Sequence, residues 1–202
     1  MLTGFLKSSR LADMGFLSRA QLEAMNFRRV GKGALLSDRA SFYGCDNIEI
    51  GDHVRIDDFC CLSSGLKGIK IGNHVHVAVY SSIIGGGRIR IDDFANISSR
   101  VSIYGSNDDY SGTWMTNPTV PDEFTGVTRL DVHIGRHVIV GSGAVILPGA
   151  RLDEGSAVGA LSLVRGVCEA FTTYAGVPAR VIGTRSRRLL TLEQAFRVRS
   201  ED

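Results

Sequence analysis

Aliphatic residues recur at every sixth position in the stretch from residue 134 to residue 164, namely Ile134, Val140, Ile146, Leu152, Val158 and Val164. Four residues after each of them comes a small or aliphatic residue, from Val138 and Ala144 to Cys168. Side chains return to the same face after about 3.6 residues in a helix and after every second residue in a strand, so a period of six fits neither alone. The pattern predicts short strands separated by tight corners, with each turn stacked on the last, which is a β-solenoid.

The same six-residue period, or beat, of aliphatic positions is present in the first half of the chain, where intervening loops interrupt it several times. It runs through four groups of residues: Val30, Leu36, Phe42 and Ile48; Ile50, Ile56 and Leu62; Ile71, Val77 and Ile83; and Ile91, Ile97 and Ile103. About three beats between interruptions predict triangular turns of roughly 18 residues. We therefore expect one all-β domain over residues 27–182. The near-copies RIDDFCCLSS (55–64) and RIDDFANISS (90–99) are interpreted as repeat ancestry and not as a duplicated site.

Residues 105–131 have no such rhythm. A loop of this length without periodicity is usually functional or disordered. It holds Trp114, the one tryptophan of the chain, together with two of its four prolines. This composition favours an ordered excursion that packs on something.

Capping boxes predict a short helix at each end of the chain. Ser18 to Gln21 would open a helix over residues 18–26, within an N-terminal helical segment 1–26. Thr191 to Gln194 would open a C-terminal helix that runs to about Val198, within residues 183–202.

Composition excludes several classes of protein. The chain has 202 residues, 44% of them hydrophobic and 22% charged, with a net charge of +2. No apolar run approaches the ~20 residues that span a bilayer, and no basic face suited to nucleic acid stands out. The N-terminus lacks a secretory pattern. The cysteines Cys45, Cys60, Cys61 and Cys168 contain no CxxC pair. We expect reduced thiols and a cytoplasmic protein.

The run IGRHVIVGSGAVILPGARLDEGSAVGALSLV, followed by AGVPARVI, resembles the hexapeptide-repeat acyltransferases. The resemblance covers roughly residues 27–182. It implies a left-handed parallel β-helix, a homotrimer, and acetyl-CoA or a similar acyl donor as co-substrate. The left hand rests on the family alone, because parallel crossovers are normally right-handed.

A narrower likeness lies in SSRVSIYGSNDDYSG, TNPTVPDEF and VGALSLV. These segments look like the bacterial enzymes that N-acetylate dTDP-4-amino-4,6-dideoxyglucose for O-antigen synthesis. The likeness implies a nucleotide-linked amino sugar as the acceptor.

The expected proton acceptor departs from the wider family. Sugar O-acetyltransferases of this family often carry a histidine base in an Asn-His-Asp-Tyr-like run, and Asp108 stands at that position here, between Asn107 and the pair Asp109-Tyr110. A hydroxyl depends on a base because it is a weak nucleophile until deprotonated. An amine that titrates near 8 is already about one-tenth neutral at pH 7. Asp108 could then suffice as proton sink, with Asn107, Asp109 and Tyr110 orienting the sugar, which favours N-acylation. The alternative is an Asx-rich turn with no catalytic role.

His76 is the second candidate for the catalytic proton acceptor. The resemblance aligns it with a position that contacts the acceptor in galactoside O-acetyltransferases, and it aligns Ser63, one turn earlier, with another. Alternatively, His76 is an outward-facing residue of a trimer interface. The other histidines are expected to be exposed decoration, with His53, His74 and His137 at one corner of successive turns and His133 just before a beat.

The resemblance also implies donor contacts in the later turns. The matching positions are Gly141, Ser142, Gly159, Ala160 and Leu161, with Arg180 toward the nucleotide phosphate of coenzyme A. The run GALSLVRGV departs from the common GAGSVVTKD, which places a leucine at residue 161 where a glycine is usual. Arg185, Arg187 and Arg188 could serve as further anion partners, but a solvated cluster of surface charges is the favoured interpretation.

Three rival functions remain. An O-acetyltransferase would modify a sugar or an antibiotic, and a non-catalytic β-helix would serve as a scaffold. A zinc hydratase of the γ-carbonic anhydrase type would need three histidines converging on one point. The pairs His133/His137 and His74/His76 do not provide that, so no metal is predicted.

Overall fold

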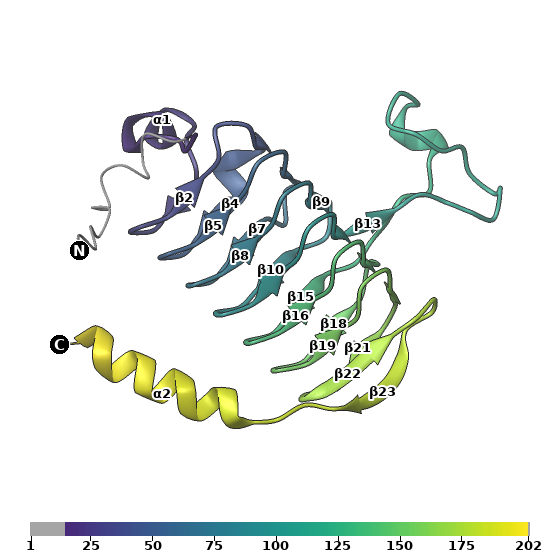
Figure 1. The fold of residues 1–202 in the computed structure, drawn as a ribbon. Coiled ribbons are helices and arrows are strands. Elements are labelled where there is room, and N and C mark those ends of the chain that lie inside the picture. Colours follow the sequence, from purple (N-terminus) through teal and green to yellow (C-terminus); the bar gives the residue numbers. More distant parts are fainter. Residues whose placement is uncertain (1–14, 202) are drawn as a thin grey trace.

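The computed structural model describes residues 15–201 and is a parallel β-helix (Figure 1). Three parallel sheets run side by side along it, and a coil contributes one short strand to each sheet. The first sheet holds seven strands, the second eight and the third six. The expectation of a solenoid built from short strands is confirmed.

Short strands make up each of the three sheets. The first sheet contains β1 (Arg29–Val30), β4 (Ile48–Ile50), β7 (Ile69–Ile71), β10 (Ile89–Ile91), β15 (Val132–Ile134), β18 (Arg151–Leu152) and β21 (Val167–Cys168). The second contains β2 (Leu35–Leu36), β5 (Arg55–Ile56), β8 (His76–Val77), β11 (Asn96–Ile97), β16 (Ile139–Val140), β19 (Ala157–Val158), β22 (Thr172–Ala175) and β23 (Arg180–Thr184). The third contains β3 (Ser41–Tyr43), β6 (Cys61–Ser64), β9 (Ser82–Gly85), β12 (Ser102–Tyr104), β17 (Val145–Ile146) and β20 (Leu163–Val164).

The six-residue period places one aliphatic residue per strand inside the coil. Ile134, Val140 and Ile146, one from each sheet of the fifth coil, are fully buried. Parallel pairing stacks equivalent residues, so Ile91 lies opposite both Ile71 and Ile134. Each coil therefore covers the apolar interior of the one before, ~4.8 Å away. The antiparallel pair β22–β23 ends this stack.

Aromatic rings stack along the corner between the first and second sheets. His53, His74, Phe94 and His137 form this ring ladder, with centroids 5.0–5.1 Å apart. The three histidines share one corner, as the sequence predicts. The expectation that they are exposed is wrong for His137, whose side chain is only 11% exposed.

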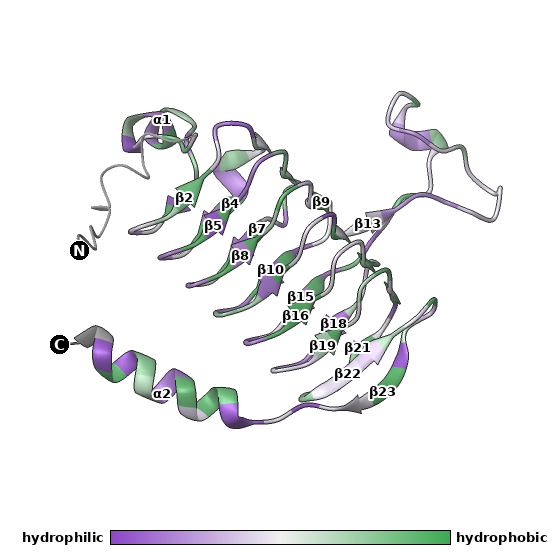
Figure 2. Cartoon of the chain, in the orientation of Figure 1, coloured by the Kyte–Doolittle hydropathy of each residue, from purple (hydrophilic) through white to green (hydrophobic). Residues whose placement is uncertain are grey.

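Helix α2 (Arg188–Glu201) returns along the outside of the coils (Figure 1) and packs on the ring ladder. The rings of Phe196 and His74 are perpendicular, with centroids 5.1 Å apart. Glu193, which is 7% exposed, accepts hydrogen bonds from His137 Nε2 at 2.6 Å and Arg197 Nε at 2.7 Å. Hydrophobic and hydrophilic residues alternate along many of the strands and along α2 (Figure 2). A buried carboxylate and aromatic contacts thus hold the helix.

The predicted start of this helix is wrong by three residues, since α2 begins at Arg188 and not at Thr191. The hydroxyl of Ser186 accepts a hydrogen bond from the Arg188 N–H at 3.2 Å, which supplies an earlier start. Thr191 to Gln194 therefore lie inside the helix.

The first capping box is confirmed. Ser18 and Gln21 exchange both of its hydrogen bonds ahead of α1 (Arg19–Ala24), whose Leu22 is buried. The helix is shorter than the predicted span 18–26. The remainder of the expected N-terminal helical segment, residues 1–14, lies outside the described residues.

Residues 105–131 leave the coils and project away from them (Figure 1). Two short antiparallel strands, β13 (Ser106–Asn107) and β14 (Thr128–Arg129), form the stem, with the short 3-10 helix η3 (Asp122–Phe124) beyond it. A second such helix, η2 (Cys45–Asn47), lies ahead of β4. Trp114 packs on Gly126, where an added Cβ would lie 2.4 Å from the indole. The excursion is ordered, as expected, and packs on itself.

The helices within residues 15–201 are too short or too polar to cross a membrane.

Candidate active site

The residues predicted to contact the acyl donor, 141–142 and 159–161, lie together at the corner between the second and third sheets. Gly141 lies beneath Gly159 and Ala160, where an added Cβ on Gly141 would stand 2.5 Å from the Ala160 nitrogen. The Leu161 N–H donates to the Ser142 carbonyl at 2.9 Å. Backbone groups thus line a narrow surface over the fifth and sixth coils.

Arg180 continues this surface toward the last coil. Arg180 is paired with Ala175 across the antiparallel strands β22 and β23. The Cβ of Ala175 lies 3.0 Å from the position of a Cβ added to Gly159. The Arg180 guanidinium is exposed and donates to its neighbour's carbonyl, that of Ala179, at 3.0 Å. Two apolar residues near this end of the β-helix are also exposed, Leu161 at 75% and Val177 at 71%. The arrangement offers an apolar surface with a cation at its end.

His76 stands on β8 and forms a pair with Asp57 of the preceding coil. Its Nε2 lies 2.8 Å from Asp57 Oδ2, and Arg55 Nε donates to Asp57 Oδ1 at 2.6 Å. Burial would raise the pKa of Asp57, but the hydrogen bonds from His76 and Arg55 outweigh it and hold that pKa below its ordinary value. A proton on Nε2, assigned from this partner, leaves Nδ1 as an acceptor on a side chain that is 42% exposed.

A second pair repeats this geometry at the other RIDDF segment. His133 Nε2 lies 2.7 Å from Asp92 Oδ2, and Arg90 Nε donates to Asp92 Oδ1 at 2.6 Å. Interpreting the two segments as mere ancestry missed this duplication. Each histidine lies on the next coil and is paired, in the parallel sheet, with the arginine of its segment: His76 with Arg55, and His133 with Arg90. Aligning the sequence coil by coil would have revealed that register.

A third Arg–x–Asp segment has the same ion pair without a histidine. Arg151 Nε lies 3.1 Å from Asp153 Oδ1, and the residue on the rung above Arg151 is Val167. This segment therefore offers an internal comparison for the two histidine pairs.

Asp109 holds the loop together through its side chain, whereas the side chains of the other three candidate residues point to solvent. Asp109 accepts hydrogen bonds from the Ser111 hydroxyl at 2.8 Å and from the Trp114 N–H at 3.1 Å. The Ser111 hydroxyl is the main reason why the pKa of Asp109 is lowered. Asn107, Asp108 and Tyr110 are exposed. The Asx-turn interpretation thus describes Asp109, and the exposed side chains stay available to a ligand.

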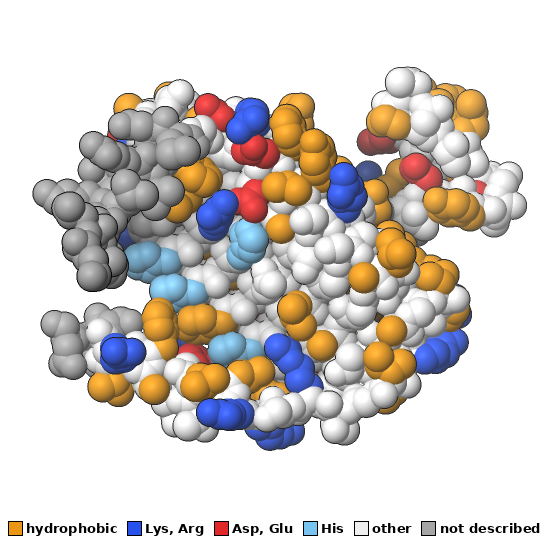
Figure 3. All heavy atoms as spheres, viewed as in Figure 1, with side chains coloured by type: hydrophobic (Ala, Val, Ile, Leu, Met, Phe, Trp, Pro, Cys, Tyr) orange, Lys and Arg blue, Asp and Glu red, His pale blue; other side chains and the backbone are white. Residues whose placement is uncertain are grey.

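One chain alone does not gather all the candidates. Ser63 lies on the third sheet and His76 on the second, whereas Asp108 belongs to the projecting loop (Figure 1). Histidine side chains are visible on the face that lies beside α2 (Figure 3). Within residues 15–201, no group of three or more His, Cys, Asp or Glu side chains is placed to hold a metal ion.

Proteins of known structure or function resemble the chain over most of its length, although no family model matches it. An Escherichia coli protein named dTDP-4-amino-4,6-dideoxy-D-glucose acyltransferase is 55% identical over 184 residues, covering 91% of this chain and 96% of that protein. AntD, an N-acyltransferase from Bacillus cereus solved with dTDP and 3-hydroxybutyryl-CoA, superposes with a TM-score of 0.88 at 40% identity, covering 93% of this chain and 99% of AntD. A serine variant of AntD, solved with dTDP-4-amino-4,6-dideoxyglucose and coenzyme A, gives 0.85 at 41% identity, covering 90% and 96%.

Proposed function

The chain belongs to the family of the dTDP-4-amino-4,6-dideoxy-D-glucose acyltransferases, and on that premise we propose that it transfers an acetyl group from acetyl-CoA to the amino group of this nucleotide-linked sugar, for O-antigen and lipopolysaccharide synthesis. The observation that carries the proposal is the 55% identity over 91% of the chain. Complexes of AntD with dTDP, the amino sugar and coenzyme A support the same substrate class.

Coenzyme A would lie over the later coils. Gly141, Ser142, Gly159, Ala160 and Leu161 would contact the pantetheine arm through their backbone, and Arg180 would meet a phosphate. The close packing of Gly141 beneath Gly159 and Ala160 supports this location, because it keeps a side chain off Gly141, while the neighbouring Ser142, Ala160 and Leu161 are exposed.

The chemistry is a direct displacement. The sugar nitrogen attacks the thioester carbonyl, a C–N bond forms, the C–S bond breaks, and coenzyme A leaves as the thiolate. Backbone N–H groups would hold the oxyanion. The proton lost by nitrogen would pass to Asp108 or to His76, with Asn107, Asp109, Tyr110 and Ser63 positioning the sugar. The Asp57 carboxylate supports His76 in this role because it fixes Nε2 and leaves Nδ1 exposed.

Asp92 is a further candidate for the proton acceptor. The solved AntD structures include variants of a serine and of an aspartate ten residues further along that chain. Three serine–aspartate pairs have this spacing within the described coils and loop here, namely Ser82–Asp92, Ser98–Asp108 and Ser99–Asp109. Only the first of these aspartates is bonded to a histidine, His133.

A homotrimer with sites between copies would bring these groups together. The strands of the third sheet carry no charged residue, and Ser82, Ser102 and Val145 stack on its outer surface. The first sheet, in contrast, shows a charge on most rungs, including Glu49, Lys70 and Arg90. An uncharged outer face favours association. The projecting loop of one copy could then reach the His76 face of another.

We place the reaction in the cytoplasm. Cys45, Cys60, Cys61 and Cys168 are free thiols in the described chain, which suits a reducing compartment.

The test is turnover of acetyl-CoA with a matched pair of nucleotide sugars that differ only in an amino or a hydroxyl group at carbon 4. We expect acetylation of the amine and at most slow reaction of the alcohol. Turnover of the hydroxy sugar alone would refute N-acylation in favour of an O-acetyltransferase. Absence of coenzyme A binding by calorimetry would favour a scaffold. Offering 3-hydroxybutyryl-CoA in a parallel reaction tests the preference for acetyl.

A further inference from the structure

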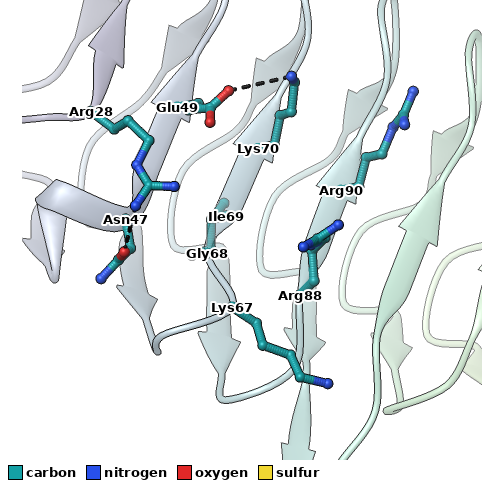
Figure 4. Close-up of a pocket in the computed structure, with 9 residues that line it drawn as sticks. All are labelled: Arg28, Asn47, Glu49, Lys67, Gly68, Ile69, Lys70, Arg88 and Arg90. Atoms are coloured by element: carbon teal, nitrogen blue, oxygen red, sulfur yellow. Dashed lines mark hydrogen bonds and ion pairs between the residues drawn. The ribbon is translucent and has the colours of Figure 1, made fainter.

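A basic groove lies on the outer surface of the first sheet, over the first four coils (Figure 4). Its volume is about 300 Å³. Five cations from three coils line it, namely Arg28, Lys67, Lys70, Arg88 and Arg90. We call this surface the basic groove.

The groove keeps an excess of positive charge after its internal pairs are counted. Glu49 pairs with Lys70 at 3.3 Å, Asp131 with Lys67 at 3.3 Å, and Asp92 with Arg90 at 2.6 Å. Five cations thus face three carboxylates, which leaves two positive charges unmatched. A ligand that carries two negative charges would balance them.

Some of the donors are already held in place. Arg28 donates to Asn47 Oδ1 at 2.9 Å and to the Asp46 carbonyl at 3.0 Å, which fixes its position at the edge of the groove. The Arg88 guanidinium makes no ion pair or hydrogen bond to another described residue. Its fork of N–H groups is therefore open to a planar pair of oxygen acceptors.

The foot of the projecting loop lies next to the groove, beside Arg88. The Arg88 N–H donates to Asp131 Oδ1 at 3.0 Å, and the preceding Gly87 N–H donates to the Gly105 carbonyl at 3.0 Å. Both ends of the loop therefore meet the chain beside Arg88. A side chain at residue 87 is excluded, because an added Cβ would lie 2.2 Å from the Leu130 carbonyl oxygen. A ligand in the groove would therefore lie beside the foot of the loop that carries Asn107 and Asp108.

We propose that the basic groove binds the diphosphate of the nucleotide-linked acceptor sugar. This assignment of the ligand rests on the proposed function. Arginine and lysine are the residues that hold phosphate oxygens, and a diphosphate supplies the two negative charges that the groove lacks. Coenzyme A also contains a diphosphate. The donor surface at Gly141 and Gly159 lies on later coils and at a different corner, so the groove is assigned to the acceptor.

Calorimetric titration with dTDP, and separately with coenzyme A, tests the proposal. The double variant Lys70→Gln/Arg88→Gln should lower the affinity for dTDP at least about tenfold, because it removes two charge-assisted contacts to the diphosphate. The affinity for coenzyme A should stay unchanged. Arg151→Gln is the matched control, because Arg151 lies on the same sheet outside the groove. Arg88→Gln alone, which removes no bond within the described chain, guards against misfolding of the double variant.

Unchanged dTDP affinity in the Arg88→Gln and double variants would overturn the proposal, and so would a wild-type protein that does not bind dTDP. Loss of coenzyme A affinity with dTDP affinity retained would assign the groove to the donor and overturn it as well. Turnover separates this inference from the proposed function. A wild-type protein that binds dTDP through the groove but does not acetylate the amino sugar would refute the function and leave the groove assignment standing.

Discussion

At the scale of single residues, carboxylates hold histidines in defined orientations. Asp57 binds His76 on one side and Arg55 on the other, so its charge is stabilised and its lowered pKa keeps it ionised at neutral pH. An ionised Asp57 holds the Nε2 proton and directs Nδ1 outward. Asp57 is therefore a positioning residue, whereas His76 is one of the candidate proton acceptors.

Replacing Asp57 by asparagine tests that role. An asparagine keeps the size of the side chain but can present its amide to Nε2 and favour the wrong tautomer. We expect kcat to fall about tenfold or more, within the range that general-base assistance contributes. The KM for acetyl-CoA should stay unchanged. Steady-state kinetics over a range of pH, with each substrate varied in turn, measures both.

The matched control is Asp153→Asn, which removes the same Arg–x–Asp ion pair where no histidine is present. It should leave kcat unchanged. Equal kcat values for wild type and Asp57→Asn would contradict the role of His76 and shift the proton acceptor to Asp108 or Asp92.

At the scale of elements, the ring ladder and α2 form one unit. The helix meets the coils through Glu193 and Phe196, and Phe196 packs on His74. Burial is the main reason why the pKa of His74 lies below its ordinary value, and the nearby His53 lowers it further. Asp93 and Asp52 oppose this shift, and Arg197 of α2 adds to it. A neutral His74 is thus the form that suits the ladder.

The sign of the pH effect follows from that lowered pKa. The unfolded chain binds a proton at His74 near pH 6.5 and the folded chain only below that value. Stability is therefore full above this pH and is lost as the pH falls through the folded-state pKa. His74→Phe, which copies Phe94 of the same ladder, should reduce the drop in melting temperature between about pH 7.5 and about pH 5.5 by on the order of 2 °C. Differential scanning calorimetry measures it, and identical drops in the two proteins would contradict the assignment to His74.

The elements also show how far sequence alone reaches. The period of six identifies inward positions such as Ile134 and Val140 because only aliphatic side chains fit inside a narrow coil, and it places the ladder histidines at one corner. The sequence does not predict the start of α2, because the Ser186 hydroxyl accepts a hydrogen bond that starts the helix before the capping-box sequence at Thr191.

The His–Asp pairs are harder to predict than the coils. His76 and His133 follow their aspartates by 19 and 41 residues, since the long loop intervenes in one case. Neither spacing is periodic, so the pairs appear only once the rungs are in register. The basic groove escapes prediction for the same reason, because its cations come from different coils and no single segment is basic.

At the scale of the whole molecule, the three outer surfaces differ in charge. The third sheet presents small and apolar side chains, and the first presents ions. We expect Ser102→Glu to prevent formation of the proposed trimer, because an unpaired charge in an interface costs about 2–5 kcal/mol. Activity should be lost with the trimer if each site needs two copies.

Light scattering coupled to size exclusion measures the mass. Arg151→Glu introduces the same charge on the first sheet and should keep the trimer mass. A Ser102→Glu protein that retains the mass of a trimer would contradict the use of the third sheet as the interface.

The crystal structure of the protein with coenzyme A and dTDP-4-amino-4,6-dideoxyglucose bound tests the central proposal most directly. We predict that the sugar nitrogen faces the sulfur of coenzyme A, with a carboxylate or imidazole acceptor, at Asp108, His76 or Asp92, within about 2.6–3.2 Å of that nitrogen or one water away. The sugar diphosphate should lie in the basic groove. A complex in which all three side chains are remote from both the nitrogen and the sulfur would contradict the proposal.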